Sequence, residues 1–280
     1  MNFYFINILS RRNLINTKSG LFLTYKRFYS NKSINSIIFD LDGVIIDSET
    51  IYYKINKKSL AHFGVEYSME LKRGQMGRKL SEGVDYLLEE TKLRDRGVKS
   101  EDYLSVYDKF FNEEINSTEG GWPLMTGANK LITHLHKSKI KMALCTGSTS
   151  KEFPKKIGKC KELIEKMNTV VLSGDDSEVK SGKPSPDPYL VTIRRMFTHP
   201  SLPPIHHKNI LVIEDSIHGV NSAISAGCKV CWIPQMEFYS LDELEYLESK
   251  IRKEDVDNLF VERINSLKEF IPEKYGLPSF

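Results

Sequence analysis

Two carboxylates stand two residues apart, directly after an apolar run near the start of the chain. The segment reads Ile38-Phe39-Asp40-Leu41-Asp42-Gly43. Gly43 frees the backbone to turn, so the two side chains can point to different parts of one site. One carboxylate can attack phosphorus as a nucleophile, while the other protonates the leaving oxygen and later deprotonates water. The pattern predicts these roles for Asp40 and Asp42; an Asx turn that ends a strand is the alternative.

Three later motifs carry groups suited to phosphate and metal binding. Thr146-Gly147-Ser148 offers a hydroxyl and backbone N–H groups for phosphate oxygens, although such a segment is more often an ordinary loop. Gly182-Lys183-Pro184 holds a lysine in a proline-stiffened turn, where it can act as counter-charge to a phosphate. Glu214-Asp215 opens a predicted helix. These two acids can bind a metal, or Asp215 can serve as a helix cap.

The charge at such a site favours a bound cation together with lysine. A hard divalent ion held by a few protein carboxylates would be Mg²⁺. Asp40, Glu214 and Asp215 with a phosphomonoester dianion would keep a charge of about −3 even with one Mg²⁺ bound. Lys183 and oriented N–H groups are therefore needed to bind the phosphate.

The motifs fall at the ends of predicted strands. Apolar runs with little alternation are typical of strands buried on both faces of a parallel sheet. Helical patterns separate them, which predicts an α/β fold with a doubly wound parallel sheet. Ligands bind at the carboxyl ends of the strands in such sheets, so the motif residues should converge on one crevice. The predicted strands are Ile37–Leu41, Ile140–Cys145, Thr169–Ser173, Ile210–Ile213 and Val230–Ile233.

The sequence pattern changes between Ser48 and about Gly120, where no segment has the pattern of a strand. Helical patterns cover roughly Ile51–Phe63, Ser81–Leu93 and Glu101–Ile115. This stretch predicts a helical domain inserted after the first strand. The expected organisation is a leader over residues 1–33, an α/β core over 34–49 and 119–280, and a helical insert over 50–118.

Composition and charge exclude several classes of protein. Of the 280 residues, 40% are apolar and 28% charged, as in globular proteins. No run approaches the ~18 apolar residues that a membrane-spanning helix needs, and four cysteines are too few for a disulfide framework. The net charge of +3 hides an acid-free leader: residues 1–39 hold six of the 40 bases, so the remaining 241 residues carry a net −3. Such a core is a poor nucleic-acid binder.

The leader has the composition of a mitochondrial transit peptide. It is basic, free of acids and rich in serine and asparagine, and it contains Arg27-Phe28-Tyr29-Ser30, which is similar to a mitochondrial processing site. The alternative is an extension that carries no targeting information. The sequence therefore leaves two locations open, the cytoplasm and the mitochondrion.

Taken in order, Asp40-x-Asp42-Gly43, Thr146, Lys183 and Glu214-Asp215 resemble the four motifs of the haloacid dehalogenase superfamily of phosphohydrolases. The resemblance implies that Asp40 is nucleophile and metal ligand, and that Asp42 is acid–base residue and ligand through its backbone carbonyl. It implies phosphate binding by Thr146, Gly147 and Lys183. Glu214 and Asp215 would complete the Mg²⁺ shell, and the helical insert would be the cap that closes over the substrate.

A finer similarity points to the eukaryotic pseudouridine-5'-phosphatases. It rests on Gly174–Val179, on the ending Tyr275–Phe280 and on the cap segment Met76-Gly77-Arg78-Lys79. Arg78 is the cap residue predicted to meet the substrate, with a solvated cap surface as the alternative. Gly147 departs from the pattern, since a serine is expected there, and so does the leader.

We therefore expect an Mg²⁺-dependent phosphomonoesterase that acts on a small phosphorylated metabolite, pseudouridine 5'-phosphate being favoured. The alternatives are a sugar or polyol phosphatase, a β-phosphoglucomutase-like phosphotransferase and, behind them, a non-catalytic phosphometabolite-binding protein. We expect a monomer with no nucleic-acid partner and no membrane insertion.

Overall fold

The computed structural model describes residues 34–76, 78, 80–117, 121–198 and 206–280. The leader expected over residues 1–33 lies outside the described residues, as do Gly77 and Lys79 of the cap motif. Within the described ranges, no helix has both the length and the apolar character needed to cross a bilayer.

Six parallel strands form one sheet in the order β3-β2-β1-β4-β5-β6. The expected α/β fold with a doubly wound parallel sheet is confirmed. The two halves diverge from β1, which pairs with β2 on one side and β4 on the other. The strands are β1 (Ser36–Phe39), β2 (Lys141–Thr146), β3 (Thr169–Leu172), β4 (Ile210–Glu214), β5 (Lys229–Trp232) and β6 (Phe260–Arg263).

The edge strand β6 is the one the sequence analysis did not find. Its segment Phe-Val-Glu-Arg has only two apolar residues, too few to stand out as a buried run. Its place is fixed by contacts from elsewhere: Val230 N donates to the Leu259 carbonyl at 2.8 Å, and Phe260 N donates to the Asp255 carboxylate at 2.6 Å.

Both faces of the sheet are buried under helices, which explains why the strands are apolar throughout. Ile37 and Ile38 are neighbours on β1, yet they belong to separate hydrophobic clusters on opposite faces. One face packs against α6 (Ala128–Lys137) and α8 (Lys161–Ile164), and the other against α9 (Asp187–Met196), α10 (Ile217–Ser225) and α11 (Leu241–Glu254). The short helix α7 (Phe153–Lys156) follows β2.

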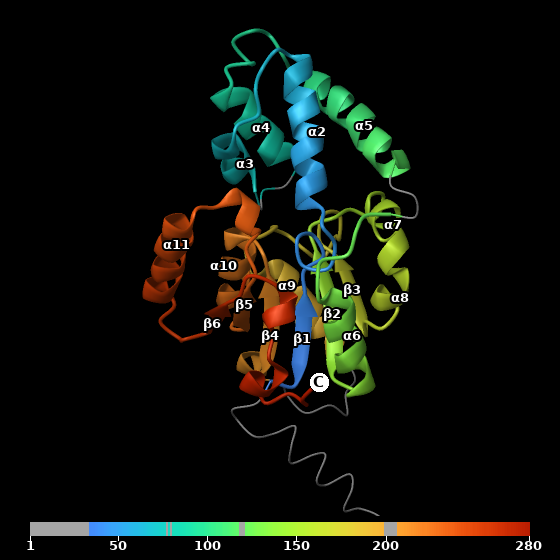
Figure 1. Cartoon of the computed structure of the whole chain (residues 1–280), viewed down its shortest axis with the longest axis vertical. Coiled ribbons are helices and arrows are strands. Elements are labelled where there is room, and N and C mark those ends of the chain that lie inside the picture. Colours follow the sequence, from blue (N-terminus) through green and yellow to red (C-terminus); the bar gives the residue numbers. More distant parts are fainter. Residues whose placement is uncertain (1–33, 77, 79, 118–120, 199–205) are drawn as a thin grey trace, which may run out of the picture.

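Four helices form a cap that stands above the sheet in Figure 1: α2 (Glu49–His62), α3 (Met69–Gln75), α4 (Leu80–Glu90) and α5 (Ser100–Ser117). Three of them fall in the expected helical patterns. Helix α3 was not anticipated because its sequence is polar and it buries only Lys72. Ser68 caps its start by accepting a hydrogen bond from Leu71 N at 3.2 Å.

The two chain segments that join the cap to the core lie side by side. Asp47 N donates to the Pro123 carbonyl at 2.8 Å, and Met125 N donates to the Ile45 carbonyl at 2.9 Å. Ile46 also forms an isolated antiparallel bridge with Leu124. The chain therefore leaves the core for the cap and returns to it at one place, directly beside the Asp40–Gly43 turn.

Helix α6 gives a direct test of this packing. Leu131 is fully buried against the sheet, so Leu131→Ala should lower the free energy of unfolding by about 2–5 kcal/mol, because it removes apolar contacts and leaves a cavity. Urea denaturation followed by circular dichroism measures this change. Lys137→Ala, at an exposed position of the same helix, should change it by less than about 1 kcal/mol. Similar losses for the two variants would contradict the packing described.

Candidate active site

The turn after β1 aims its two carboxylates in different directions. Asp40 continues the strand, with its N–H donating to the Ile213 carbonyl of β4 at 3.0 Å. The chain then folds back through Gly43, whose φ of +72° suits glycine. A Cβ at Gly43 would lie 2.0 Å from the Asp215 carboxylate. The absence of that atom lets the turn approach β4, so that Asp40 and Asp215 share one site.

Glu214 and Asp215, the second pair of acids, stand at the carboxyl end of β4. Glu214 is fully buried, and its Oε2 accepts hydrogen bonds from Asp215 N at 3.1 Å and Ser216 N at 3.3 Å. Helix α10 begins directly afterwards, with Ser216 capping it by accepting from Gly219 N at 3.0 Å. A Cβ at Gly219 would lie 1.9 Å from the Glu214 carboxylate, so glycine is required there. Strand end and helix start thus fix both acids.

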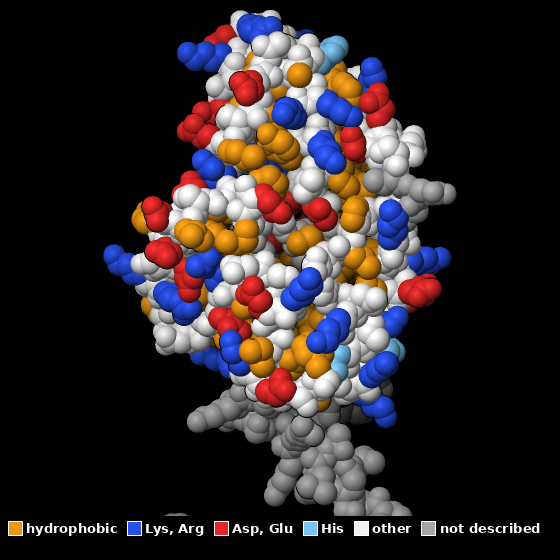
Figure 2. All heavy atoms as spheres, in the orientation of Figure 1, with side chains coloured by type: hydrophobic (Ala, Val, Ile, Leu, Met, Phe, Trp, Pro, Cys, Tyr) orange, Lys and Arg blue, Asp and Glu red, His pale blue; other side chains and the backbone are white. Residues whose placement is uncertain are grey.

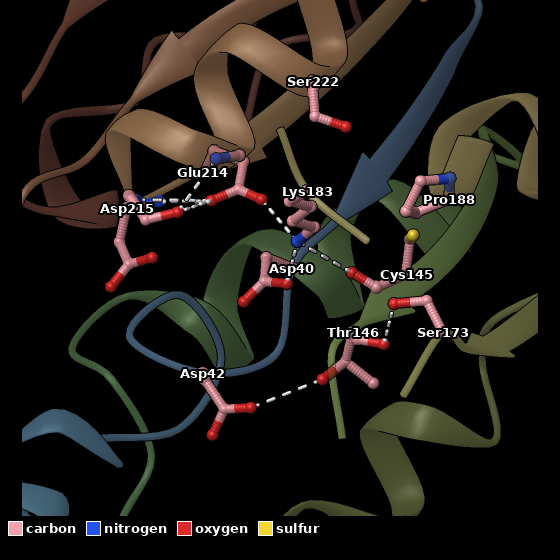
Figure 3. Close-up of polar contacts among 12 residues, drawn as sticks. Asp40, Asp42, Cys145, Thr146, Ser173, Lys183, Pro188, Glu214, Asp215 and Ser222 are labelled. Carbon is pink, nitrogen blue, oxygen red and sulfur yellow. Dashed lines mark hydrogen bonds and ion pairs between the residues drawn. The ribbon is translucent and has the colours of Figure 1, made fainter. Parts of the chain in front are cut away.

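The acids predicted to bind the metal are brought together. One oxygen each of Asp40, Glu214 and Asp215 lies within 4.8 Å of the others, and all three residues are buried. The Asp215 carboxylate accepts no hydrogen bond from any residue the structure describes, and Figure 3 shows it pointing away from Glu214. A buried carboxylate without a donor fits a hard cation such as Mg²⁺. Asp40 and Asp215 would hold the ion, while Glu214 would have to give up an existing hydrogen bond to join them.

Lys183 supplies the counter-charge for two of these acids. Its Nζ donates to Asp40 Oδ1 at 2.6 Å and to Glu214 Oε1 at 2.5 Å, and its side chain is 11% exposed. The Tyr189 hydroxyl also donates to Glu214 Oε1, at 2.5 Å. Although burial opposes it, the charges of Asp40 and Glu214 raise the pKa of Lys183 well above its ordinary value. Lys183 is therefore a permanent cation beside the predicted nucleophile.

Burial and neighbouring charge push the pKa values of the two turn carboxylates apart. Burial, together with the charges of Glu214 and Asp42, raises the pKa of Asp40 from 3.8 to about 7 against the opposing effect of Lys183. Burial also acts to raise the pKa of Asp42, but the charge and hydrogen bonds of Lys156 outweigh it and lower that pKa. The two neighbouring carboxylates therefore differ in proton affinity in the metal-free chain.

The carboxylate of Asp42 faces the end of β2 instead of the acid cluster, as Figure 3 shows. Its Oδ2 accepts hydrogen bonds from Thr146 Oγ1 at 3.3 Å and from Ser148 Oγ at 3.1 Å. This orientation leaves the backbone of Asp42 as its route to a metal, as the family resemblance implies. It also commits the Thr146 hydroxyl, predicted to bind phosphate, to a contact with Asp42.

The loop after β2 borders the cavity and is fixed by hydrogen bonds. Ser150 N and Oγ donate to the Asp175 carboxylate, at 3.0 Å and 2.6 Å, which ties the loop to the segment after β3. Gly147 is exposed and lines the cavity. A Cβ there would meet no atom within 4 Å. The site therefore has room for the serine expected at this position, and glycine leaves the backbone N–H in place.

Sequence reasoning missed the buried cation beside Asp42. Lys156 Nζ lies 2.9 Å from Asp42 Oδ1, 3.1 Å from Asp42 Oδ2 and 2.7 Å from Ser148 Oγ. Only 2% of its side chain is exposed. Lys156 follows the Thr146–Ser148 loop within a run of several lysines, and no residue pattern sets it apart from the others. Lys156 adds the second positive charge that the sequence-based charge count lacked.

The site opens into a cavity of about 210 Å³ between core and cap. Figure 2 shows acidic side chains at the level where the cap meets the core. The cap contributes mainly polar groups to the cavity: Glu49, Asn56, Lys72, Gln75 and Arg78. Lys72, itself buried, forms an ion pair with Glu49. The chain thus offers charged and hydrogen-bonding groups on the cap side, opposite the acid cluster.

Arg78 lines the cavity at its exposed cap side. Its Nε donates to the Gly74 carbonyl at 2.7 Å, and its guanidinium group lies 5.1 Å from the centre of the Tyr86 ring. These contacts hold the side chain without consuming all of its donors. Contact between Arg78 and a substrate stays a prediction.

A family model for haloacid dehalogenase-like hydrolases matches residues 37–233 of the chain. The chain belongs to this family. The match runs from β1 to β5 and includes the whole cap, so it covers the residues of the four motifs. The hydrolase therefore carries its Asp40 turn, its β2 loop, Lys183 and its Glu214-Asp215 pair within one recognised family domain.

Several of its relatives are named as phosphatases of small phosphorylated metabolites, and the hydrolase is a phosphatase of this kind. It is 35% identical to (DL)-glycerol-3-phosphatase 2 of Arabidopsis thaliana over 248 residues, which cover 89% of the hydrolase and 93% of the relative. It is 33% identical to (DL)-glycerol-3-phosphatase 1, mitochondrial, of the same plant, over 89% of the hydrolase and 75% of the relative. It is also 30% identical to a probable pseudouridine-5'-phosphatase of Drosophila melanogaster, over 89% and 96% of the two chains.

The raised pKa of Asp40 predicts that stabilisation by Mg²⁺ depends on pH. In the metal-free hydrolase, protonated Asp40 contributes stability that is full below its ordinary pKa of 3.8 and is lost as the pH rises through about 7. Mg²⁺ needs the ionised carboxylate, so it competes with that proton in acid. Thermal unfolding with millimolar Mg²⁺ against EDTA should show an increase in Tm of at least about 2 °C near pH 8 and a smaller one near pH 5.5.

The matched control is Asp40→Asn, which removes both the titrating proton and the predicted ligand. Its melting temperature should respond weakly to Mg²⁺ at both pH values. An equal response of the natural chain at the two pH values would show that Asp40 does not control metal binding.

Proposed function

We propose that the hydrolase is an Mg²⁺-dependent phosphomonoesterase that works through a phosphorylated Asp40. The observation that carries this proposal is that Asp40 contacts Lys183 at 2.6 Å and shares an acid cluster with Asp215, whose carboxylate receives no hydrogen bond from the described residues. When bound, Mg²⁺ would polarise a phosphoryl oxygen and offset the negative charge of the carboxylates. A dianionic phosphate could then approach Asp40 without prohibitive repulsion.

In this mechanism each residue of the chain has a separate task. The Asp40 carboxylate attacks phosphorus, and the bond to the leaving oxygen breaks as Asp42 gives that oxygen a proton. Water then attacks the phosphoryl group on Asp40 and returns a proton to Asp42, which releases phosphate and restores both carboxyl groups. Lys183 and the N–H groups of the loop at Gly147 hold the phosphate oxygens during both steps.

For the substrate we favour a short polyol phosphate, with glycerol 3-phosphate as the type compound. The cavity of about 210 Å³ is smaller than the ~300–1,000 Å³ typical of sites for larger ligands. Its tyrosine rings are already engaged, since Lys156 lies 5.0 Å above Tyr52 and Tyr107 stacks on Phe111. Polar groups such as Glu49 and Lys72 suit hydroxyls better than a base. The two glycerol-3-phosphatase relatives support the same choice.

Pseudouridine 5'-phosphate, favoured by the sequence analysis, stays the second candidate. It is supported by the relative named a probable pseudouridine-5'-phosphatase, which matches 89% of this chain. Arg78, at the exposed side of the cavity, could reach the part of a larger substrate that extends beyond the enclosed space.

Phosphate release by the purified chain in Mg²⁺ separates these candidates. The panel holds glycerol 3-phosphate, pseudouridine 5'-phosphate, uridine monophosphate, a hexose 6-phosphate and β-glucose 1-phosphate. We expect kcat/KM for glycerol 3-phosphate to exceed that for the nucleotides by at least about tenfold, because the smaller ester fits the cavity while a nucleotide would extend out of it. A reversed order would select pseudouridine 5'-phosphate instead.

Two controls test the chemistry apart from the substrate. Asp40→Asn should lower kcat by at least about 10³-fold, because it removes the attacking carboxylate. Chelation of Mg²⁺ should also stop phosphate release, and added Mg²⁺ should restore it. Conversion of β-glucose 1-phosphate to an isomer without free phosphate would point to a mutase, and binding without turnover would point to a phosphometabolite-binding protein.

We further propose that the leader directs the hydrolase to mitochondria. Support comes from its acid-free, basic composition and from the relative whose name includes the word mitochondrial. Residues 1–36 fused to a fluorescent reporter should confine the signal to mitochondria in cells. Replacing Arg11, Arg12, Lys18, Lys26 and Arg27 by glutamine in the same fusion should disperse it. A diffuse signal from the unaltered fusion would favour the cytoplasm.

A further inference from the structure

A second lysine is buried in the site, and the mechanism above gives it no task. Lys156 Nζ contacts both oxygens of Asp42, at 2.9 and 3.1 Å, and Ser148 Oγ at 2.7 Å. Its ammonium group also lies 5.0 Å from the centre of the Tyr52 ring and 5.3 Å from that of Trp122. Since a lysine ammonium has three protons, Asp42 and Ser148 account for all of them.

The fold holds this lysine in place through its backbone. Helix α7 starts where Thr149 and Glu152 bond to each other: Thr149 N donates to Glu152 Oε2 at 3.1 Å, and Glu152 N donates to Thr149 Oγ1 at 3.3 Å. Lys156 ends this helix, and its carbonyl accepts a hydrogen bond from Trp122 N at 3.1 Å. The returning chain from the cap and the loop after β2 therefore fix Lys156 together. Such support is expected of a side chain that must be accurately placed.

The two carboxylate oxygens of Asp42 have different numbers of hydrogen-bond partners. Oδ2 accepts from Thr146 at 3.3 Å, Ser148 at 3.1 Å and Lys156 at 3.1 Å, whereas Oδ1 accepts from Lys156 at 2.9 Å. Oδ2 is therefore anchored from several sides. Oδ1 keeps a lone pair that can carry the proton.

We propose that Lys156 is a positioning residue, which orients Asp42 so that Oδ1 faces the leaving oxygen and, later, the attacking water. The inference rests on the proposed function, because it assigns Lys156 a part in the proton transfers of Asp42. The proton leaves Oδ1 as the bond from phosphorus to the leaving oxygen breaks. It is replaced from the water that attacks the phosphorylated Asp40, so the cycle balances. Lys156 itself neither gains nor loses a proton.

The choice of leaving group tests this role. p-Nitrophenolate leaves without a proton, whereas the alkoxide of glycerol 3-phosphate needs one, and both esters share the second step. Lys156→Met should lower kcat for glycerol 3-phosphate by about 10²–10⁴-fold, the range of general acid–base catalysis. With p-nitrophenyl phosphate the first step should stay within about tenfold of the natural chain, while the second becomes slow. Stopped-flow absorbance should then record a burst of p-nitrophenolate of about one per enzyme molecule.

The matched control is Lys155→Met. Lys155 is the adjacent residue of α7, but its side chain is exposed, so this variant should retain the rates of the natural chain on both esters. Thermal unfolding of each variant checks that it is folded. If Lys156→Met does not fold, Lys156→Gln takes its place; because it keeps one donor towards Asp42, the same pattern is expected with a smaller loss.

A double-mutant cycle distinguishes positioning of Asp42 from direct binding of phosphate. If Lys156 acts only through Asp42, adding Lys156→Met to Asp42→Asn should cost less than about threefold further in the rate on p-nitrophenyl phosphate. An equal loss in both backgrounds would overturn the proposal. So would a rise in KM with unchanged kcat, or an equal loss on both esters without a burst.

The same data separate this inference from the proposed function. If the natural chain hydrolyses neither ester in Mg²⁺, the proposed function fails and the inference fails with it. If the natural chain hydrolyses both while Lys156→Met shows no dependence on the leaving group, the role of Lys156 alone is refuted.

Discussion

The structure depends on placing four carboxylates in one largely buried space at the end of a sheet. Buried charge is costly unless it is paired, so each acid must be compensated by its surroundings. Lys183 serves Asp40 and Glu214 together, and Lys156 serves Asp42. Glu214 also receives hydrogen bonds from the start of α10. The fourth acid, Asp215, receives no hydrogen bond from the described residues, which leaves one defined location for a cation.

This unequal compensation also gives the two turn carboxylates different behaviour. Asp40 and Asp42 are separated by one residue, yet burial among acids raises the pKa of one and a lysine lowers that of the other. The difference comes from elements distant in the sequence: Lys183 precedes α9, and Lys156 ends α7. The parallel sheet makes this arrangement possible because it brings the ends of β1, β2 and β4 to one edge. Rigid strands and helix starts then keep the charges at fixed separations.

Much of the core could be predicted from the sequence because each signal was local. Asp40, Lys183 and Asp215 stand at the ends of apolar runs or in proline- and glycine-rich turns, and chain order alone places those ends on one side of a parallel sheet. The strand β6 could not be predicted, since its position is set by pairing with β5 and its own apolar content is low.

Lys156 shows the other limit of sequence reasoning. Its neighbours Lys151, Lys155 and Lys159 are exposed, and nothing in the sequence distinguishes it from them. Only the fold, which packs the segment at Trp122 beside α7, reveals which of these lysines is buried. Helix α3 was not predicted for a related reason: its one buried residue is itself a lysine. Burial of a charged side chain depends on partners that are remote in the chain, and periodicity does not detect them.

The paired entry and exit of the cap have a consequence for how this enzyme can change over evolutionary time. Because the Asp47 N–H and the Pro123 carbonyl meet at 2.8 Å, the chain enters and leaves the inserted domain at one place on the core. An insertion whose two ends lie together can change in length or sequence while the core chain that carries the reacting groups keeps its path. The residues proposed to react and the polar groups that the cap presents to the cavity thus lie on separate stretches of chain, which leaves the second set able to vary independently of the first.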